Sequence, residues 1–181
     1  MESFFGEIEG AGFEILEEEF SKCLTGHGRV ERLWTGARWV EGPVWFPAGR
    51  FILFSDIPNN RMLRWDETNG SVSEFRNPSN FSNGNTRDLQ GRLITCQHFS
   101  RSVTRTEHSG KITTIANQFD GKRLNSPNDV IVKSDGSIWF TDPDYGIMSD
   151  YEGQKSPSEQ SSCNVFRIDQ KTGDIHLITD R

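Results

Sequence analysis

Three polar residues occupy equivalent places in three similar stretches of this chain, and together they have the chemistry of a cation site. They are Glu41 in "VEGPVW", Asn83 in "SNGN" and Asn128 in "SPND", and each lies eight residues before a glycine. Carboxylate and carboxamide oxygens are the hard donors that Ca²⁺ and Mg²⁺ prefer, with Mn²⁺ and Zn²⁺ as alternatives. We therefore expect a divalent metal ion, Ca²⁺ first and Zn²⁺ or Mg²⁺ otherwise.

Simpler interpretations of these residues compete with a metal site. Asn, Pro, Asp and Ser are common turn residues, and "SPND" stands directly before a strand-like run. Glu41 lies between Trp39 and Trp45, where a buried carboxylate needs a cation or hydrogen-bond donors to offset its lost hydration. A salt bridge to an arginine such as Arg123 would serve equally well. The recurrence of a polar residue at the same position in each repeat favours a metal site over these alternatives.

A repeat of about 42 to 45 residues must position these side chains. The stretches "FPAGRFILFSD" (46–56), "DLQGRLITCQH" (88–98) and "KSDGSIWFTD" (133–142) each contain a turn with glycine followed by a strand-like run with a polar end. Further hairpin patterns follow at 62–75, 103–115 and 165–178. Four strands in each repeat of this length are typical of a β-propeller, and an ordinary β-sandwich is the alternative. We expect an all-β chain of about three blades.

The propeller geometry predicts where the polar residues meet. The first strand of each blade lines the central channel, so Glu41, Asn83 and Asn128 should converge there. The second strands run back to the same face, and their polar ends, at Asp56, Gln97 with His98, and Asp142, should surround the mouth. His98 is a candidate substrate contact or proton carrier, or a structural histidine. Asp142 is a candidate substrate contact or a loop-capping residue.

Two segments fall outside the repeat. Residues 1–29 form an N-terminal extension in which Phe13, Leu16, Phe20 and Leu24 have helix-like spacing, and "TGHG" supplies a stop. Residues 143–163 form a long connection, expected to be the least ordered internal segment and either a lid over the site or a flexible surface loop.

Composition excludes several classes of protein. The chain has 181 residues and a formal net charge of -6, with no run of Lys and Arg, so nucleic acid and anionic membranes are poor partners. We expect no membrane span and no secretory signal in "MESFFGEIEGAG". The separated cysteines Cys23, Cys96 and Cys163 indicate free thiols in a reducing cytoplasm.

The combination of "RWVEGPVW", "SDIPNNRMLRWD", "NGNTRDLQGRLITCQH", "RLNSPNDVIVKSDGSIWFTDPDYG" and "VFRIDQKTG" resembles the gluconolactonase/SMP-30/LRE family, and bacterial gluconolactonases most. The resemblance covers roughly residues 30 to 180. It implies a six-bladed propeller with a divalent metal on its axis, of which residues 30–181 correspond to the N-terminal half. The implied activity is hydrolysis of sugar lactones to aldonic acids.

The resemblance also implies roles for particular residues. Glu41 and Asn128 match family positions that bind the metal, Asn128 alternatively substrate. The substrate-binding candidates are Asn83, His98, Arg123, Asp129 and Asp142. Some members carry a basic residue where this chain has Ser126, and Arg123 is the expected substitute. The family's later ligands and the general base would lie beyond Arg181.

Three functions remain open from the sequence. The first is metal-dependent lactone hydrolysis, with the cation polarising the lactone carbonyl. The second is a related propeller esterase or organophosphate hydrolase. The third is an inactive, truncated propeller that acts as a binding module. Fold alone does not choose among them, and the oligomeric state and the activity of the 181-residue chain by itself stay open.

Overall fold

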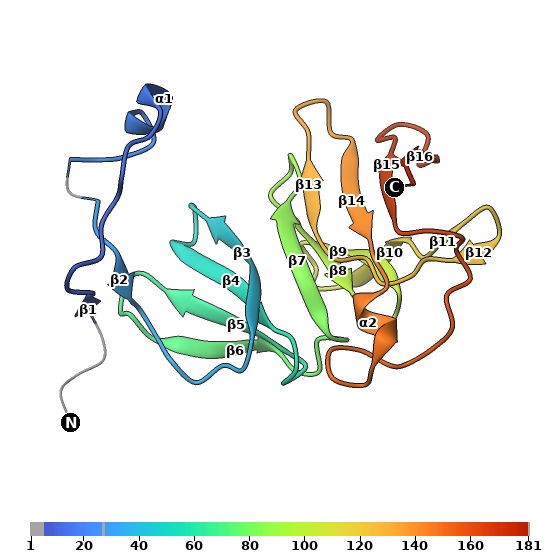
Figure 1. Ribbon diagram of the computed structural model, residues 1–181, viewed down its shortest axis with the longest axis horizontal. Coiled ribbons are helices and arrows are strands. Elements are labelled where there is room, and N and C mark those ends of the chain that lie inside the picture. Colours follow the sequence, from blue (N-terminus) through green and yellow to red (C-terminus); the bar gives the residue numbers. More distant parts are fainter. Residues whose placement is uncertain (1–5, 27, 181) are drawn as a thin grey trace. The chain divides into compact units, whose positions relative to one another are not determined.

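The computed structural model describes residues 6–26 and 28–180 and divides the chain into two compact units, residues 1–36 and 37–181. The larger unit is built almost entirely of antiparallel sheet, as Figure 1 shows. The boundary between these units falls after Gly36.

Three four-stranded sheets, each a meander of consecutive strands, form three blades of a β-propeller. Their strands are β3 (Val40–Phe46), β4 (Phe51–Asp56), β5 (Arg61–Asp66) and β6 (Val72–Arg76); β7 (Ser82–Arg87), β8 (Leu93–Gln97), β9 (Ser102–Thr106) and β10 (Ile112–Ala116); and β13 (Val130–Val132), β14 (Ile138–Asp142), β15 (Asn164–Ile168) and β16 (Ile175–Thr179). The repeat read from the sequence therefore corresponds to the blades.

Local turn chemistry explains why the repeat forms hairpins. In the third blade, Gly136 adopts a φ of +82° in the turn between β13 and β14, a conformation that costs glycine little. The Asp135 carboxylate accepts hydrogen bonds from the backbone N–H and the hydroxyl of Ser137, at 2.9 and 2.6 Å. These bonds lower the pKa of Asp135 to about 2. The hairpin expected from "KSDG" is confirmed.

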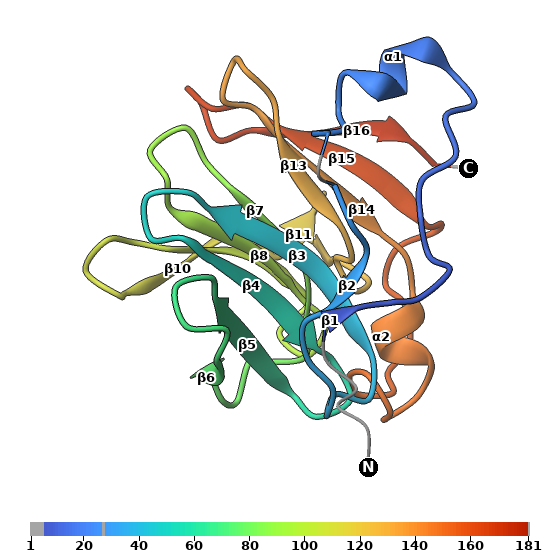
Figure 2. The same ribbon diagram turned by 90° about the vertical axis from the view of Figure 1, so that its left-hand side faces the viewer.

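The first strands of neighbouring blades lie side by side, β3 next to β7 and β7 next to β13, as the views in Figures 1 and 2 agree. Their backbones approach so closely that a Cβ on Gly42 would collide with Asn83 O, and one on Gly84 would lie 2.5 Å from Asn128 O. The pairing of β3 with β4 and of β7 with β8 is irregular at these same glycines. Such bulges re-aim side chains, here those of Glu41 and Asn83.

Apolar side chains fill the space between the blades. Between the first two blades the buried residues are Val44, Leu53, Met62 and Leu93. Between the second and third blades a larger cluster contains Phe140 and Phe166, whose ring centroids lie 5.3 Å apart. Burial of this apolar surface fixes the angles between the blades and thereby holds the first strands in place.

Residues 1–36 form a small unit of their own, with β1 (Gly6–Glu7) paired to β2 (Glu31–Arg32) and a one-turn helix α1 (Glu18–Ser21). The expected helix through Phe13 to Leu24 is therefore wrong beyond that single turn. α1 has no side-chain cap and buries no residue, and a helix so short gains too few hydrogen bonds to be stable alone. Residues 1–5 and His27 of "TGHG" lie outside the described residues.

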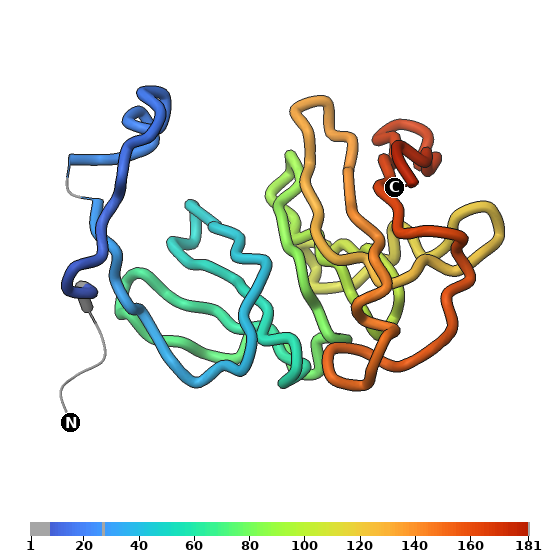
Figure 3. The backbone as a smooth tube through the Cα atoms, in the orientation of Figure 1, coloured from blue at the N-terminus to red at the C-terminus, as the bar shows by residue number. Residues whose placement is uncertain are grey.

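The connection over residues 143–163, expected to be either a lid or a flexible surface loop, is anchored at several points. It contains the short helix α2 (Tyr145–Met148), and the loop after α2 returns to it, with Gln154 N donating to Gly146 O at 3.0 Å. Asn125 Nδ2 donates to Ser162 O at 3.0 Å, and Arg123 N donates to Glu159 Oε2 at 2.8 Å. The tube in Figure 3 shows the segment returning along the third blade.

The three cysteines agree with the expectation of free thiols. Cys23 and Cys163 are exposed, Cys96 is buried, and all three are free thiols. Among the described residues, no helix has both the length and the apolar character needed to cross a membrane.

Candidate functional site

A pocket of about 510 Å³ opens where the first strands of the three blades meet. Glu41, Asn83, Asn128 and Asp129 all line it. The expectation that the three repeated positions converge is therefore met in the geometry. Strand order explains the convergence, because Glu41 and Asn83 lie in the innermost strands of the first two blades, and Asn128 and Asp129 directly precede the innermost strand of the third.

Glu41 is half-buried rather than fully buried, which corrects the expectation from its aromatic neighbours. The indole Nε1 of Trp39 donates to Glu41 Oε1 at 2.9 Å. No Lys, Arg or His nitrogen of the described residues lies within 4 Å of its carboxylate, so the alternative of a salt bridge to Arg123 is not realised there. The Glu41 side chain thus lines the pocket with no described cationic side chain beside it.

Asn83 and Asn128 bring carboxamides to the same pocket from the second and third blades. Asn83 is 2% exposed, and its Nδ2 lies 3.3 Å from His98 Nε2. Asn128 is half-buried, and its backbone carbonyl accepts from Gly84 N at 2.7 Å. The Asn83 carboxamide is thus held by His98, and the backbone of Asn128 is tied to that of Gly84 in the neighbouring strand.

Asp129 is exposed at the rim of the pocket, and its Oδ1 accepts from Val130 N at 2.9 Å. Arg123, by contrast, lies in the short hairpin β11 (Gln118–Phe119) and β12 (Lys122–Arg123) and does not line the pocket. Arg123 therefore does not supply to this pocket the basic group that some family members carry at the position of Ser126.

His98 is completely buried, so it lies behind the pocket rather than on its surface. Its Nδ1 lies 2.9 Å from the carbonyl oxygen of Glu152 in the 143–163 connection. Burial lowers the pKa of His98 below the ordinary value, so the ring is neutral at pH 7. The structural-histidine alternative describes this position better than a direct substrate contact does.

Asp142 is also buried, and it holds a loop rather than facing the pocket. Its Oδ2 accepts from Asn125 N at 2.8 Å. Burial raises the pKa of Asp142 to about 7, although the backbone N–H groups of Asn125 and Ser126 and the charge of Arg101 act in the opposite direction. The loop-capping alternative fits this geometry.

Two residues near the pocket were not anticipated, Trp39 as a partner of Glu41 and Glu152 in the long connection. The pKa of Glu152 is raised by burial and, second, by the negative charge of Glu41, which indicates that the two carboxylates lie near each other. Sequence offers one signal for Glu152, the glycines Gly146 and Gly153 on either side of it, but the repeat offers none because the connection is unique to the third blade.

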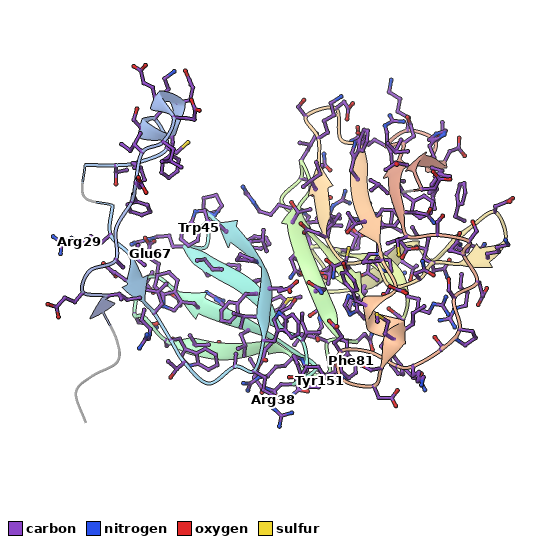
Figure 4. The ribbon with its side chains drawn as sticks, in the orientation of Figure 1. Arg29, Arg38, Trp45, Glu67, Phe81 and Tyr151 are labelled. Carbon is purple, nitrogen blue, oxygen red and sulfur yellow. The ribbon has the colours of Figure 1, made fainter. Side chains whose placement is uncertain are left out.

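The mouth lies at the end of the blades where β3 and β7 begin. Figure 4 labels Arg38, Phe81 and Tyr151 at this end, and Trp45 at the opposite end of β3. Arg38 N donates to Asp56 Oδ1 at 3.0 Å, which fixes the entry to β3. Asp56 was expected at the mouth itself, but like Gln97, His98 and Asp142 it is buried and does not line the pocket; it holds the loop before β3 instead.

In chemical terms, the pocket offers oxygen acceptors and no described cationic side chain on its lining. No group of three His, Cys, Asp or Glu side chains suited to a metal occurs in the described part of the chain. A cation held here would depend on Glu41 together with carboxamide oxygens, which suits a hard ion such as Ca²⁺.

Comparisons with known proteins agree on one family. The profile described as "SMP-30/Gluconolactonase/LRE-like region" matches residues 39–181. A gluconolactonase from Zymomonas mobilis is 33% identical over 153 residues, which is 77% of this chain and 42% of the relative. This chain thus spans less than half the length of that relative.

Solved structures show the same fold. A gluconolactonase structure from Xanthomonas campestris superposes with a TM-score of 0.82 and 37% identity over 86% of this chain and 52% of that one. A regucalcin from Agrobacterium tumefaciens, described as a calcium-binding protein, has a TM-score of 0.57 over 79% of this chain and 43% of that one, but at 13% identity it supports the fold alone. The propeller and the matched profile together show that this chain belongs to the SMP-30/gluconolactonase/LRE-like family.

Proposed function

We propose that this protein hydrolyses sugar lactones of the gluconolactone type to aldonic acids, with the help of a divalent cation. The observation that carries the proposal is the convergence of Glu41, Asn83 and Asn128 on one pocket, with no described cation beside Glu41. The relatives named gluconolactonase support the substrate class.

The donor set fits a hard cation. Glu41 and Asn128 would hold it, and Glu41 keeps Oε2 available because Trp39 occupies Oε1 alone. Burial and, second, the negative charge of Glu41 raise the pKa of Glu152, and a positive ion beside the two carboxylates would offset the repulsion between them. We take Ca²⁺ as the first choice, with Zn²⁺ or Mg²⁺ as alternatives.

When bound, a divalent cation supplies Lewis-acid polarisation of a carbonyl oxygen. The chain's own residues orient the substrate: Asn83 and Asp129 line the pocket and can accept hydrogen bonds from sugar hydroxyls. In the reaction, water adds to the lactone carbonyl carbon and loses a proton to a base, the ring C–O bond breaks, and the ring oxygen leaves as a hydroxyl. We assign the base to none of the described residues.

We also propose that the protein works in the cytoplasm on a small molecule, without nucleic acid or membrane as a partner. The three free cysteines and the acidic balance of the sequence support this environment.

A lactone assay tests the proposal. Hydrolysis of glucono-δ-lactone is followed by acid release, before and after treatment with a chelator and after return of Ca²⁺ or Zn²⁺. We expect hydrolysis that the chelator abolishes and a metal restores. Parallel assays with simple esters and an organophosphate separate the alternatives: faster turnover of either class would overturn the assignment to sugar lactones, and no turnover of any substrate would favour the binding module.

A further inference from the structure

We propose that the connection over residues 143–163 determines which atom of Asn83 the pocket presents, acting through the buried ring of His98. In this role His98 is a positioning residue. The proposal about hydrogen-bond orientation stands on geometry alone, and its consequence for ligand binding rests on the proposed function.

The contact with Glu152 determines which ring nitrogen of His98 carries the proton. Its Nδ1 lies 2.9 Å from the backbone carbonyl oxygen of Glu152, which can only accept a hydrogen bond. Nδ1 must therefore carry the proton, because two acceptors at this distance would repel each other. The Glu152 carboxylate lies farther away, with Oε2 3.9 Å from Nδ1, which is too far for a hydrogen bond.

The proton on Nδ1 of His98 in turn determines how the Asn83 carboxamide is oriented. A neutral imidazole with its proton on Nδ1 leaves Nε2 as an acceptor. Asn83 must then turn its amide nitrogen toward the ring, and Nδ2 does lie 3.3 Å from Nε2. The carbonyl oxygen Oδ1 is the atom turned away from His98, and it has no partner among the described residues.

Burial removes the alternative of a doubly protonated ring. His98 has no exposed surface, and Asn83 is 2% exposed. Burial lowers the pKa of His98, which agrees with a neutral ring at pH 7. A single tautomer therefore connects the carbonyl of Glu152 to the carboxamide of Asn83.

The connection is held against His98 by tight packing. A Cβ on Gly146 would lie 2.5 Å from His98 Cβ and Cγ, and a Cβ on Gly153 would collide with Gly146 O. Because no side chain fits at either glycine, the carbonyl of Glu152 has little freedom to move away from Nδ1. Its length allows this connection of the third blade to reach back to His98 in the second blade.

The consequence is a pocket that presents acceptors. Asn83 lines the pocket together with Glu41 and Asn128, and with its Oδ1 turned away from His98 the pocket suits hydroxyl groups or a cation and disfavours an anion. Under the proposed function, the hydroxyls of a sugar lactone are the matching donors.

The orientation can be tested by NMR on the 181-residue chain. Long-range ¹H–¹⁵N spectra at pH 7 distinguish protonated from unprotonated ring nitrogens, and the His98 signals are assigned by their loss in His98→Gln. We expect a protonated Nδ1 and an unprotonated Nε2 in one tautomer. A proton on Nε2, or exchange between the two tautomers, would overturn the proposal whatever the protein binds.

Two variants of His98 separate its hydrogen bond to Glu152 O from the hydrogen bond that it accepts from Asn83. In His98→Asn the new amide can still donate to Glu152 O from the Nδ1 position, but Asn83 loses its acceptor. In His98→Gln the carbonyl can still accept from Asn83 near the Nε2 position, but the tie to Glu152 is lost. We expect affinity for glucono-δ-lactone or Ca²⁺ to fall by about tenfold or more in His98→Asn and by less in His98→Gln.

A matched control is His108→Gln, which changes an exposed histidine in a turn and should leave affinity unchanged. Equal losses in the two His98 variants would contradict positioning and indicate a space-filling ring. If the unchanged chain binds neither probe, the proposed function fails, while the tautomer measurement still decides the orientation.

Discussion

Gly146 is the position at which the packing of the long connection on the second blade can be tested most sharply. An alanine Cβ there would lie 2.5 Å from Cβ and Cγ of His98 and 2.7 Å from its Nδ1. Ordinary contacts of a Cβ begin near 3.4 Å, so three atoms of a fully buried ring must shift, or the connection must move away. Overpacking of this kind costs about 1–3 kcal/mol.

The measurement is the free energy of unfolding in urea for Gly146→Ala, together with thermal unfolding. In a chain of this size the expected cost corresponds to a fall in Tm of about 2 to 12 °C. Amide exchange of Glu152 and Gln154 should accelerate as the connection loosens. Gly12→Ala is the matched control, because nothing lies within 4 Å of its added Cβ. Equal stability of Gly146→Ala and the unchanged chain would refute the packing described above.

Further predictions concern the partners of two carboxylates. Trp39→Phe removes the indole donor from Glu41 Oε1, so Ca²⁺ affinity measured by calorimetry should fall by about tenfold, and unchanged affinity would contradict the role of Trp39. Burial raises the pKa of Asp142 to about 7, above the value of about 3.9 in an unfolded chain, so the folded state binds more protons between these values. The free energy of unfolding of the unchanged chain should therefore decline from about pH 4 to pH 7 relative to that of Asp142→Asn, as measured by urea unfolding. Parallel pH profiles for the two proteins would count against a buried, protonated Asp142.

Sequence periodicity was sufficient to predict the blades and the meeting of three repeated positions. Each blade is a local meander, so the spacing of Gly49, Gly91 and Gly136 carries over directly into space. Close backbone approach at Gly42 and Gly84 then forces the neighbouring polar side chains toward one pocket.

Features that depend on contacts between distant segments could not be predicted in this way. His98 looked like a residue of the mouth, but the 143–163 connection folds over it and buries it. Arg123 follows its own short hairpin away from the pocket. The apolar spacing from Phe13 to Leu24 suggested a longer helix, but α1 buries no residue there and has no side-chain cap, so only one turn forms.

The central claim is that the pocket holds a cation through Glu41, and calorimetric titration of the 181-residue chain with Ca²⁺ tests it most directly. One carboxylate supported by carboxamides should give saturable binding with a Kd of about 10⁻⁴–10⁻³ M. We expect Glu41→Gln to abolish this binding, and Glu14→Gln, which removes an exposed carboxylate outside the pocket, to leave it unchanged. Binding of equal strength in Glu41→Gln, or no binding by the unchanged chain, would contradict the claim.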